Sequence, residues 1–150
     1  MRATIASLLN LNINDLPNYI ELGNDWFNQM LADLKKYGYK YDGMYHNKNY
    51  TRLLHPTDNC FKSGKWHRPS IITPKCLYKE KGIDGYFYAG VLSPKFFNWQ
   101  SLNSHAVVID KNFNIIHDPN PNYHNILEYP LKSLLGYNGI IDIYIFNSLT

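Results

Sequence analysis

The sequence predicts an α+β protein, in which helices near the N-terminus precede an antiparallel β-sheet. The clearest helical spacing of apolar residues lies in the first 37 residues. From residue 85 onward, short apolar runs alternate with turn residues, as strands do. Helices and strands in separate blocks are typical of the α+β class. A chain of 150 residues fits one domain over residues 1–150, because two halves would each have a thin core.

The composition excludes several classes of protein. An apolar fraction of 45% is ordinary for a globular chain and excludes wholesale disorder. A formal charge of +3, scattered along the chain, predicts no nucleic-acid partner. No apolar run approaches the roughly 18 residues of a membrane span. The N-terminus lacks the pattern of a signal peptide. We therefore expect a cytoplasmic protein with no membrane partner. Abundant Asn, Ile, Lys and Tyr, whose codons are AT-rich, point to a bacterial or phage genome.

Two helices are predicted near the N-terminus. Residues 2–9 place small and apolar side chains at helical spacing. Residues 20–37 carry a stronger apolar stripe, with Asn24 or Asp25 as the N-cap. Gly38 is expected to end this helix in a left-handed conformation.

The rest of the chain is predicted to be mostly β. Residues 39–84 form a divergent connecting segment that holds one or two short strands, the first beginning at Tyr39. Four further strands are predicted over residues 86–92, 105–109, 114–118 and 140–146. Residues 130–136 are predicted to form a short helix.

The hairpin formed by residues 105–118 carries the most informative side chains. A turn centred between Lys111 and Asn112 places His105 directly opposite Asp118, with Cβ atoms roughly 5 Å apart. A carboxylate in that position would accept a hydrogen bond from one imidazole nitrogen and leave the other to act as a base. The inference depends on register, because a one-residue shift would separate the two faces.

The remaining reactive side chains are predicted to be structural or solvent-exposed. The other histidines are His46, His55, His67, His117 and His124. Cys60 and Cys76 are too few for a disulfide framework and are expected to be reduced. The sequence contains no metal-binding motif, phosphate loop or dinucleotide fingerprint, so no cofactor and no metal are expected.

Motifs at both ends of the chain resemble one known family. Residues 2–9 read Arg-Ala-Thr-Ile-Ala-Ser-Leu-Leu, and residues 16–19 read Leu-Pro-Asn-Tyr. Ser-Pro at 93–94, His-Ala-Val-Val at 105–108 and His-Asp-Pro at 117–119 follow in order. With these motifs the chain resembles small phage and bacterial papain-like cysteine peptidase-type proteins, over about residues 2–36 and 86–146.

The resemblance implies a papain-like fold of C39-like arrangement, with N-terminal helices packed on an antiparallel β-sheet. It also implies Cys-His-Asp chemistry on an amide or thioester. In that family a Cys thiolate at the start of the first helix attacks a carbonyl carbon and forms an acyl-enzyme. By matching positions, His105 would be the base and Asp118 its orienting partner. The implied substrate or ligand is a peptide or small molecule in a cleft near His105.

The chain departs from the family pattern at the nucleophile, whose position falls one residue before Met1. Three explanations are open. The native reading frame could start upstream of Met1, the protein could be a relative that lost the Cys and kept the fold, or Cys60 could have taken over the role. The polar loop around Cys60 has no helix after it, which disfavours the third explanation. As written, the chain is expected to be an inactive hydrolase.

Two other functions stay open at this point. One is a non-catalytic protein that uses the same scaffold to hold a small ligand or a host protein, for example as a phage counter-defence factor. The other is an interaction protein, since the chain has 13 Tyr, 7 Phe and 3 Trp.

Overall fold

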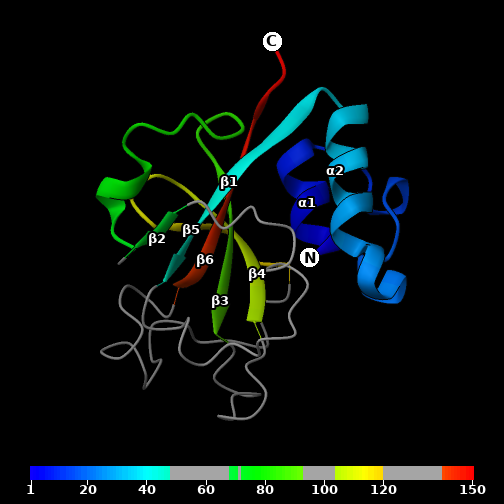
Figure 1. The fold of residues 1–150 in the computed structure, drawn as a ribbon, viewed down its shortest axis with the longest axis horizontal. Coiled ribbons are helices and arrows are strands. Elements are labelled where there is room, and N and C mark those ends of the chain that lie inside the picture. The colour runs from blue at the N-terminus through cyan, green and yellow to red at the C-terminus, as the bar shows by residue number, and fades with distance from the viewer. Residues whose placement is uncertain (48–67, 71, 93–103, 120–139) are drawn as a thin grey trace.

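The computed structural model describes residues 1–47, 68–70, 72–92, 104–119 and 140–150 (Figure 1). Two helices lie on one side of a curved sheet, which confirms the predicted α+β class. The helices are α1 (Arg2–Leu9) and α2 (Trp26–Lys36), and the 3₁₀ turns are η1 (Ile13–Asp15), η2 (Tyr19–Asp25) and η3 (Pro74–Leu77). The strands are β1 (Tyr39–Asn47), β2 (Arg68–Ser70), β3 (Phe87–Leu92), β4 (Ser104–Ile109), β5 (Ile115–His117) and β6 (Ile140–Ser148).

The first helix has the predicted bounds, but the second is shorter than predicted. Residues 19–25 form a 3₁₀ turn in which Gly23 has a φ of 57°, and this left-handed residue breaks the helix before Trp26. Asp25 occupies the N-cap position without a side-chain capping bond. Gly38 has a φ of 86°, and its N–H donates to the Lys35 carbonyl at 3.1 Å, so it follows the helix end as predicted.

The sheet has six strands in the order β2-β1-β6-β3-β4-β5. Five of them pair antiparallel, as predicted, whereas β2 pairs parallel with β1 at one edge, which was not expected. The last strand in the chain, β6, lies between β1 and β3. In the connecting segment, residues 48–67 and 71 lie outside the described residues, as does the predicted helix at 130–136.

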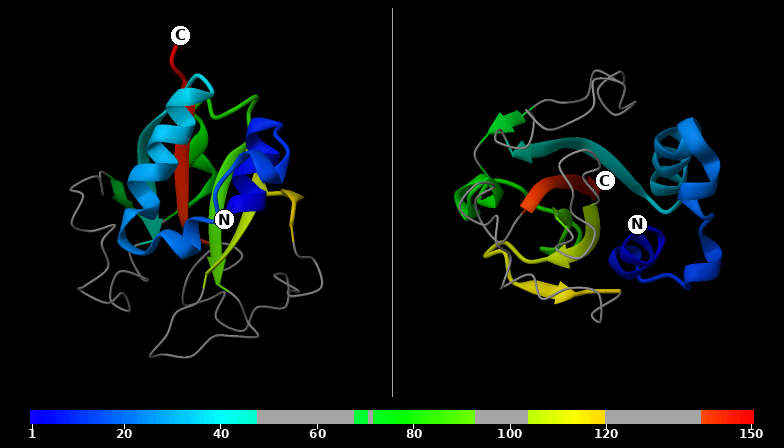
Figure 2. Two further views of the ribbon diagram at one scale, coloured as in Figure 1. Left: turned by 90° about the vertical axis from the view of Figure 1, so that its right-hand side faces the viewer. Right: turned by 90° about the horizontal axis from the view of Figure 1, so that it is seen from below.

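Both faces of the sheet are apolar, and each carries its own core. On the helix side, strand residues Met44, Tyr88, Ala106, Val108, Tyr144 and Phe146 pack with Ile5, Leu9, Met30 and Leu34. On the concave side, Phe87, Val91, Val107, Ile109, Ile143 and Ile145 pack with Ile72, Leu77 and Phe113. Figure 2 shows the sheet curving between these layers, with η3 on the side away from the helices. In the described part of the chain, no helix has the length and apolar character needed to cross a membrane.

Candidate functional site

His105 and Asp118 meet at the end of the sheet where β4 begins. The imidazole Nε2 lies 2.6 Å from the Asp118 Oδ1 atom. The two side chains are only 15% and 14% exposed, so the contact is largely shielded from water. The predicted contact is therefore present.

The turn that joins β4 and β5 differs from the predicted turn. The Asn114 carbonyl accepts the N–H of Asp110 at 3.0 Å, so the loop has three residues rather than two. Phe113 closes the loop with a φ of 66° and buries its ring in the concave core. The Asp110 carboxylate accepts the backbone N–H groups of Asn112 and Asn114 at 2.8 and 2.9 Å. Burial raises the pKa of Asp110, but a hydrogen bond from the Asn114 side chain, together with these two backbone bonds, outweighs burial and holds the pKa below its usual value.

The predicted register is wrong, yet the predicted face is right. The turn pairs Ile109 with Ile115, one residue away from the expected pairing. An irregularity after Val108 pairs that residue with His117 and adds a second one-residue shift. Two shifts restore the alternation of side chains, so Asp118 stays on the face of His105 as a diagonal neighbour rather than a direct one.

Helix α1 packs against β4 beside this pair. The Thr4 hydroxyl, fully buried in the first turn of α1, donates to the Ala106 carbonyl at 3.0 Å. The amino end of α1 is directed toward the end of the sheet at which β4 begins (Figures 1 and 2). Strand pairing aligns His105 with Val91 of the concave core, whereas Ala106 faces the helices. His105 therefore belongs to the face of β4 opposite α1, at the second residue of the strand.

Replacing Thr4 by valine should destabilise the protein by about 1–2 kcal/mol, because the Ala106 carbonyl loses a buried hydrogen bond while the volume is kept. Urea unfolding followed by circular dichroism measures the change. The control is Ser7→Ala, which removes an exposed hydroxyl from the same helix and should change stability by less than about 0.5 kcal/mol. Equal losses in both variants would argue against an anchoring role of Thr4.

A second polar group lies in the adjacent strands, and sequence reasoning missed it. The structure extends β1 to Asn47 and buries His46 within it to 2% exposure. Burial lowers the pKa of His46 to about 4. Strand pairing places His46 opposite Asp142, whose Oδ1 accepts the Gly90 N–H at 3.1 Å. A bulge between Tyr41 and Met44 interrupts the alternation of β1, so no local pattern marked His46 as buried.

The other candidate side chains do not join the pair. Cys76 lies in η3, where its sulfur accepts the Thr73 N–H at 3.5 Å, a local capping contact. His117 is exposed on the edge strand β5. The candidates that lie outside the described residues are Cys60, His55, His67 and His124. Among the residues described, no three His, Cys, Asp or Glu side chains are grouped to hold a metal ion.

The fold and the site together define an α+β protein with a shielded histidine–carboxylate pair at the end of the sheet where β4 begins. Comparisons with protein-family models, with curated proteins and with solved structures find no match to this chain.

Proposed function

We propose that this end of the sheet is a thiol-dependent acyl-transfer centre of papain-like type, acting on an amide or thioester. The observation that carries the proposal is the 2.6 Å contact between His105 and Asp118 in a shielded setting. His105 would be the general base and Asp118 the positioning residue. The thiol would belong at the amino end of α1.

The carboxylate at Nε2 suits a histidine that exchanges protons through its other nitrogen. A hydrogen bond from Nε2–H to Asp118 favours the tautomer with its lone pair on Nδ1, and it stabilises the imidazolium that forms when a proton arrives. Shielding from water strengthens this electrostatic effect.

The amino end of α1 suits a thiolate. The first turn of a helix carries unpaired N–H groups and partial positive charge, which stabilise an anion there and lower the pKa of a thiol. The Thr4 bond to Ala106 holds this turn one residue away from His105 along β4, so a thiol there would reach the His105 face around the start of the strand. A residue that preceded Met1 would extend from the end of α1 that points to the sheet end bearing His105.

The proposed reaction proceeds in two steps. His105 takes the thiol proton, and the thiolate attacks the substrate carbonyl carbon to form a carbon–sulfur bond. The imidazolium gives that proton to the leaving amine or thiol as the scissile bond breaks. In the second step His105 takes a proton from water as the water oxygen attacks the acyl carbon. The carbon–sulfur bond breaks to release the acid, and the imidazolium returns its proton to the thiolate.

The proposal is tested by placing Gly-Cys immediately before Met1, so that the added thiol is not on the terminal residue. The alkylation rate of this Cys by iodoacetamide at pH 6.5 is measured by mass spectrometry and compared with that of Cys76 in the same molecule. We expect the added Cys to react at least about tenfold faster, because an ordinary thiol of pKa near 8.5 is only about 1% ionised at that pH.

The matched variants are His105→Ala and Asp118→Asn in the same extended chain. The first should return the added Cys to the rate of an ordinary thiol, and the second should slow it by less. An added Cys whose rate is the same with and without His105 would overturn the proposal. That outcome would favour the other predicted role, a binding protein without catalysis.

A further inference from the structure

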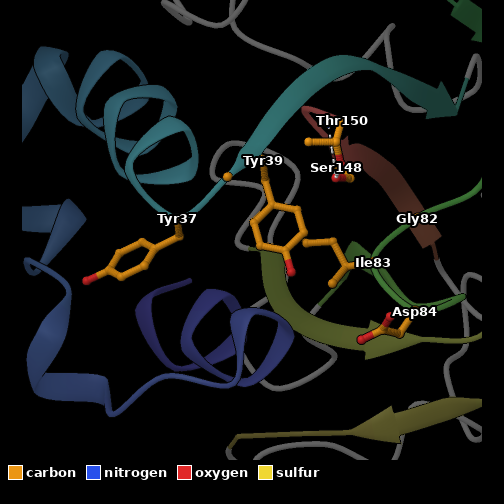
Figure 3. Close-up of a pocket in the computed structure, with 8 residues that line it drawn as sticks. Tyr37, Tyr39, Gly82, Ile83, Asp84, Ser148 and Thr150 are labelled. Carbon is orange, nitrogen blue, oxygen red and sulfur yellow. Dashed lines mark hydrogen bonds between the residues drawn. The ribbon is translucent and has the colours of Figure 1, made fainter.

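A second site lies at the opposite end of the sheet from His105 and Asp118. It is a cavity of about 420 Å³, within the size range of small-molecule pockets. Figure 3 shows its lining, which comes from the start of β1, the turn before β3 and the end of β6. The lining residues are Tyr37, Gly38, Tyr39, Gly82, Ile83, Asp84, Ser148 and Thr150.

The described lining combines one charged side chain with an aromatic ring and hydroxyl groups. Asp84 carries the one charged side chain among these residues, and it is exposed. No ion pair involves Asp84 in the part of the chain that the structure describes. The ring of Tyr39 extends toward Ile83 and Asp84, whereas the ring of Tyr37 points away toward the helices (Figure 3). The hydroxyls of Ser148 and Thr150, 2.9 Å apart, lie on the other side.

The turn that carries Asp84 is held in place by its own backbone and by β6. Ile83 and Tyr86 exchange two backbone hydrogen bonds of 3.0 and 2.9 Å, and between them Asp84 adopts a φ of 55°. The Asn147 side chain accepts the Gly82 N–H at 3.0 Å, which ties the turn to β6. The carboxylate is thus presented from a constrained backbone, and a constrained site loses less entropy when a ligand binds.

We propose that this cavity binds a small organic ammonium. A carboxylate attracts a cation, and an aromatic face within about 6 Å of an ammonium adds a cation–π attraction. Hydroxyl oxygens can accept the N–H bonds of a primary amine. A carboxylate with no cationic partner in the described lining would repel an anion. The site is separate from the His105 centre and does not depend on the function proposed there.

The test is a titration of the protein with n-butylammonium, followed by the ¹H–¹⁵N shifts of the Gly38, Gly82 and Gly85 amides. The expected result is a saturable shift of these amides with a millimolar Kd. The neutral analogue 1-butanol should bind at least about tenfold more weakly. Asp84→Asn, which keeps the shape and tolerates a positive φ, should weaken butylammonium binding about tenfold.

The matched control is Glu21→Gln, which removes the same charge from the exposed η2 turn and should leave the Kd unchanged. Two results would overturn the proposal. One is 1-butanol binding as tightly as butylammonium, which would show that charge has no part. The other is an unchanged Kd in Asp84→Asn, which would place the cation elsewhere.

Discussion

Replacing Gly82 by alanine should destabilise the protein by about 3 kcal/mol, one of the two largest effects that we expect. A Cβ atom at this position would lie 2.5 Å from the Tyr86 carbonyl oxygen and 2.9 Å from ring atoms of Phe87. Neither neighbour can yield easily, because the carbonyl is backbone and the Phe87 ring is buried in the concave core. The φ of +70° adds the cost of a left-handed conformation for a residue with a side chain.

Gly85→Ala separates the collision from the conformational cost. Gly85 has a φ of +85°, but a Cβ there would meet nothing within 4 Å. This variant should therefore lose only about 1 kcal/mol, the ordinary cost of a left-handed alanine. Urea unfolding of both variants measures the difference, and equal losses would contradict the proposed collision at Gly82.

Acid should destabilise the protein through His46. Burial lowers its pKa from the ordinary 6.5 to about 4 in the folded protein. As the pH falls from 6.5, the unfolded chain takes up a proton on this imidazole and the folded protein does not. The stability that the neutral His46 contributes is therefore complete above pH 6.5. It falls by about 3 kcal/mol between pH 6.5 and 4, and below pH 4 it does not fall further.

The effect of His46 is isolated by comparing the parent protein with His46→Leu. The difference between their free energies of unfolding at pH 7.5 reports the packing cost of the substitution, since the imidazole is neutral there in both states. Below pH 6.5 the parent should lose stability more steeply than the variant, because only the parent carries His46. The other titrating groups are common to both proteins, so their effects cancel in the difference. Parallel curves from pH 7.5 to 4 would refute the claim that a buried neutral imidazole causes acid sensitivity.

The contact between His105 and Asp118 shows how far sequence reasoning could reach at the candidate site. The hairpin and its turn residues were predictable, because turn chemistry and apolar alternation are local. The loop length was not, since it depends on Phe113, whose ring is buried in a core assembled from distant strands. The longer loop shifts the register by one residue, and the irregularity at Val108 shifts it by one more. The second shift returns Asp118 to the face of His105, so the two side chains still meet.

His46, Asp142 and Gly90 illustrate what local patterns do not contain. These residues are far apart in the chain, and strand pairing brings them into one row across β1, β6 and β3. A Cβ at Gly90 would collide with the Asp142 carboxylate, so the glycine is explained only by its neighbour. No spacing in the sequence links the three.

The sequence by itself determined the α+β class, the bounds of α1 and the approximate position of the strands in the described region. Those features follow from side-chain periodicity and turn residues, which act over a few positions. Only the tertiary structure decided that β6 lies between β1 and β3, that β2 joins in parallel and that His46 is buried. These outcomes depend on which distant segments bury one another's apolar faces. The pairing that forms is the one that gives the whole core the lowest free energy, and no short stretch of sequence contains that information.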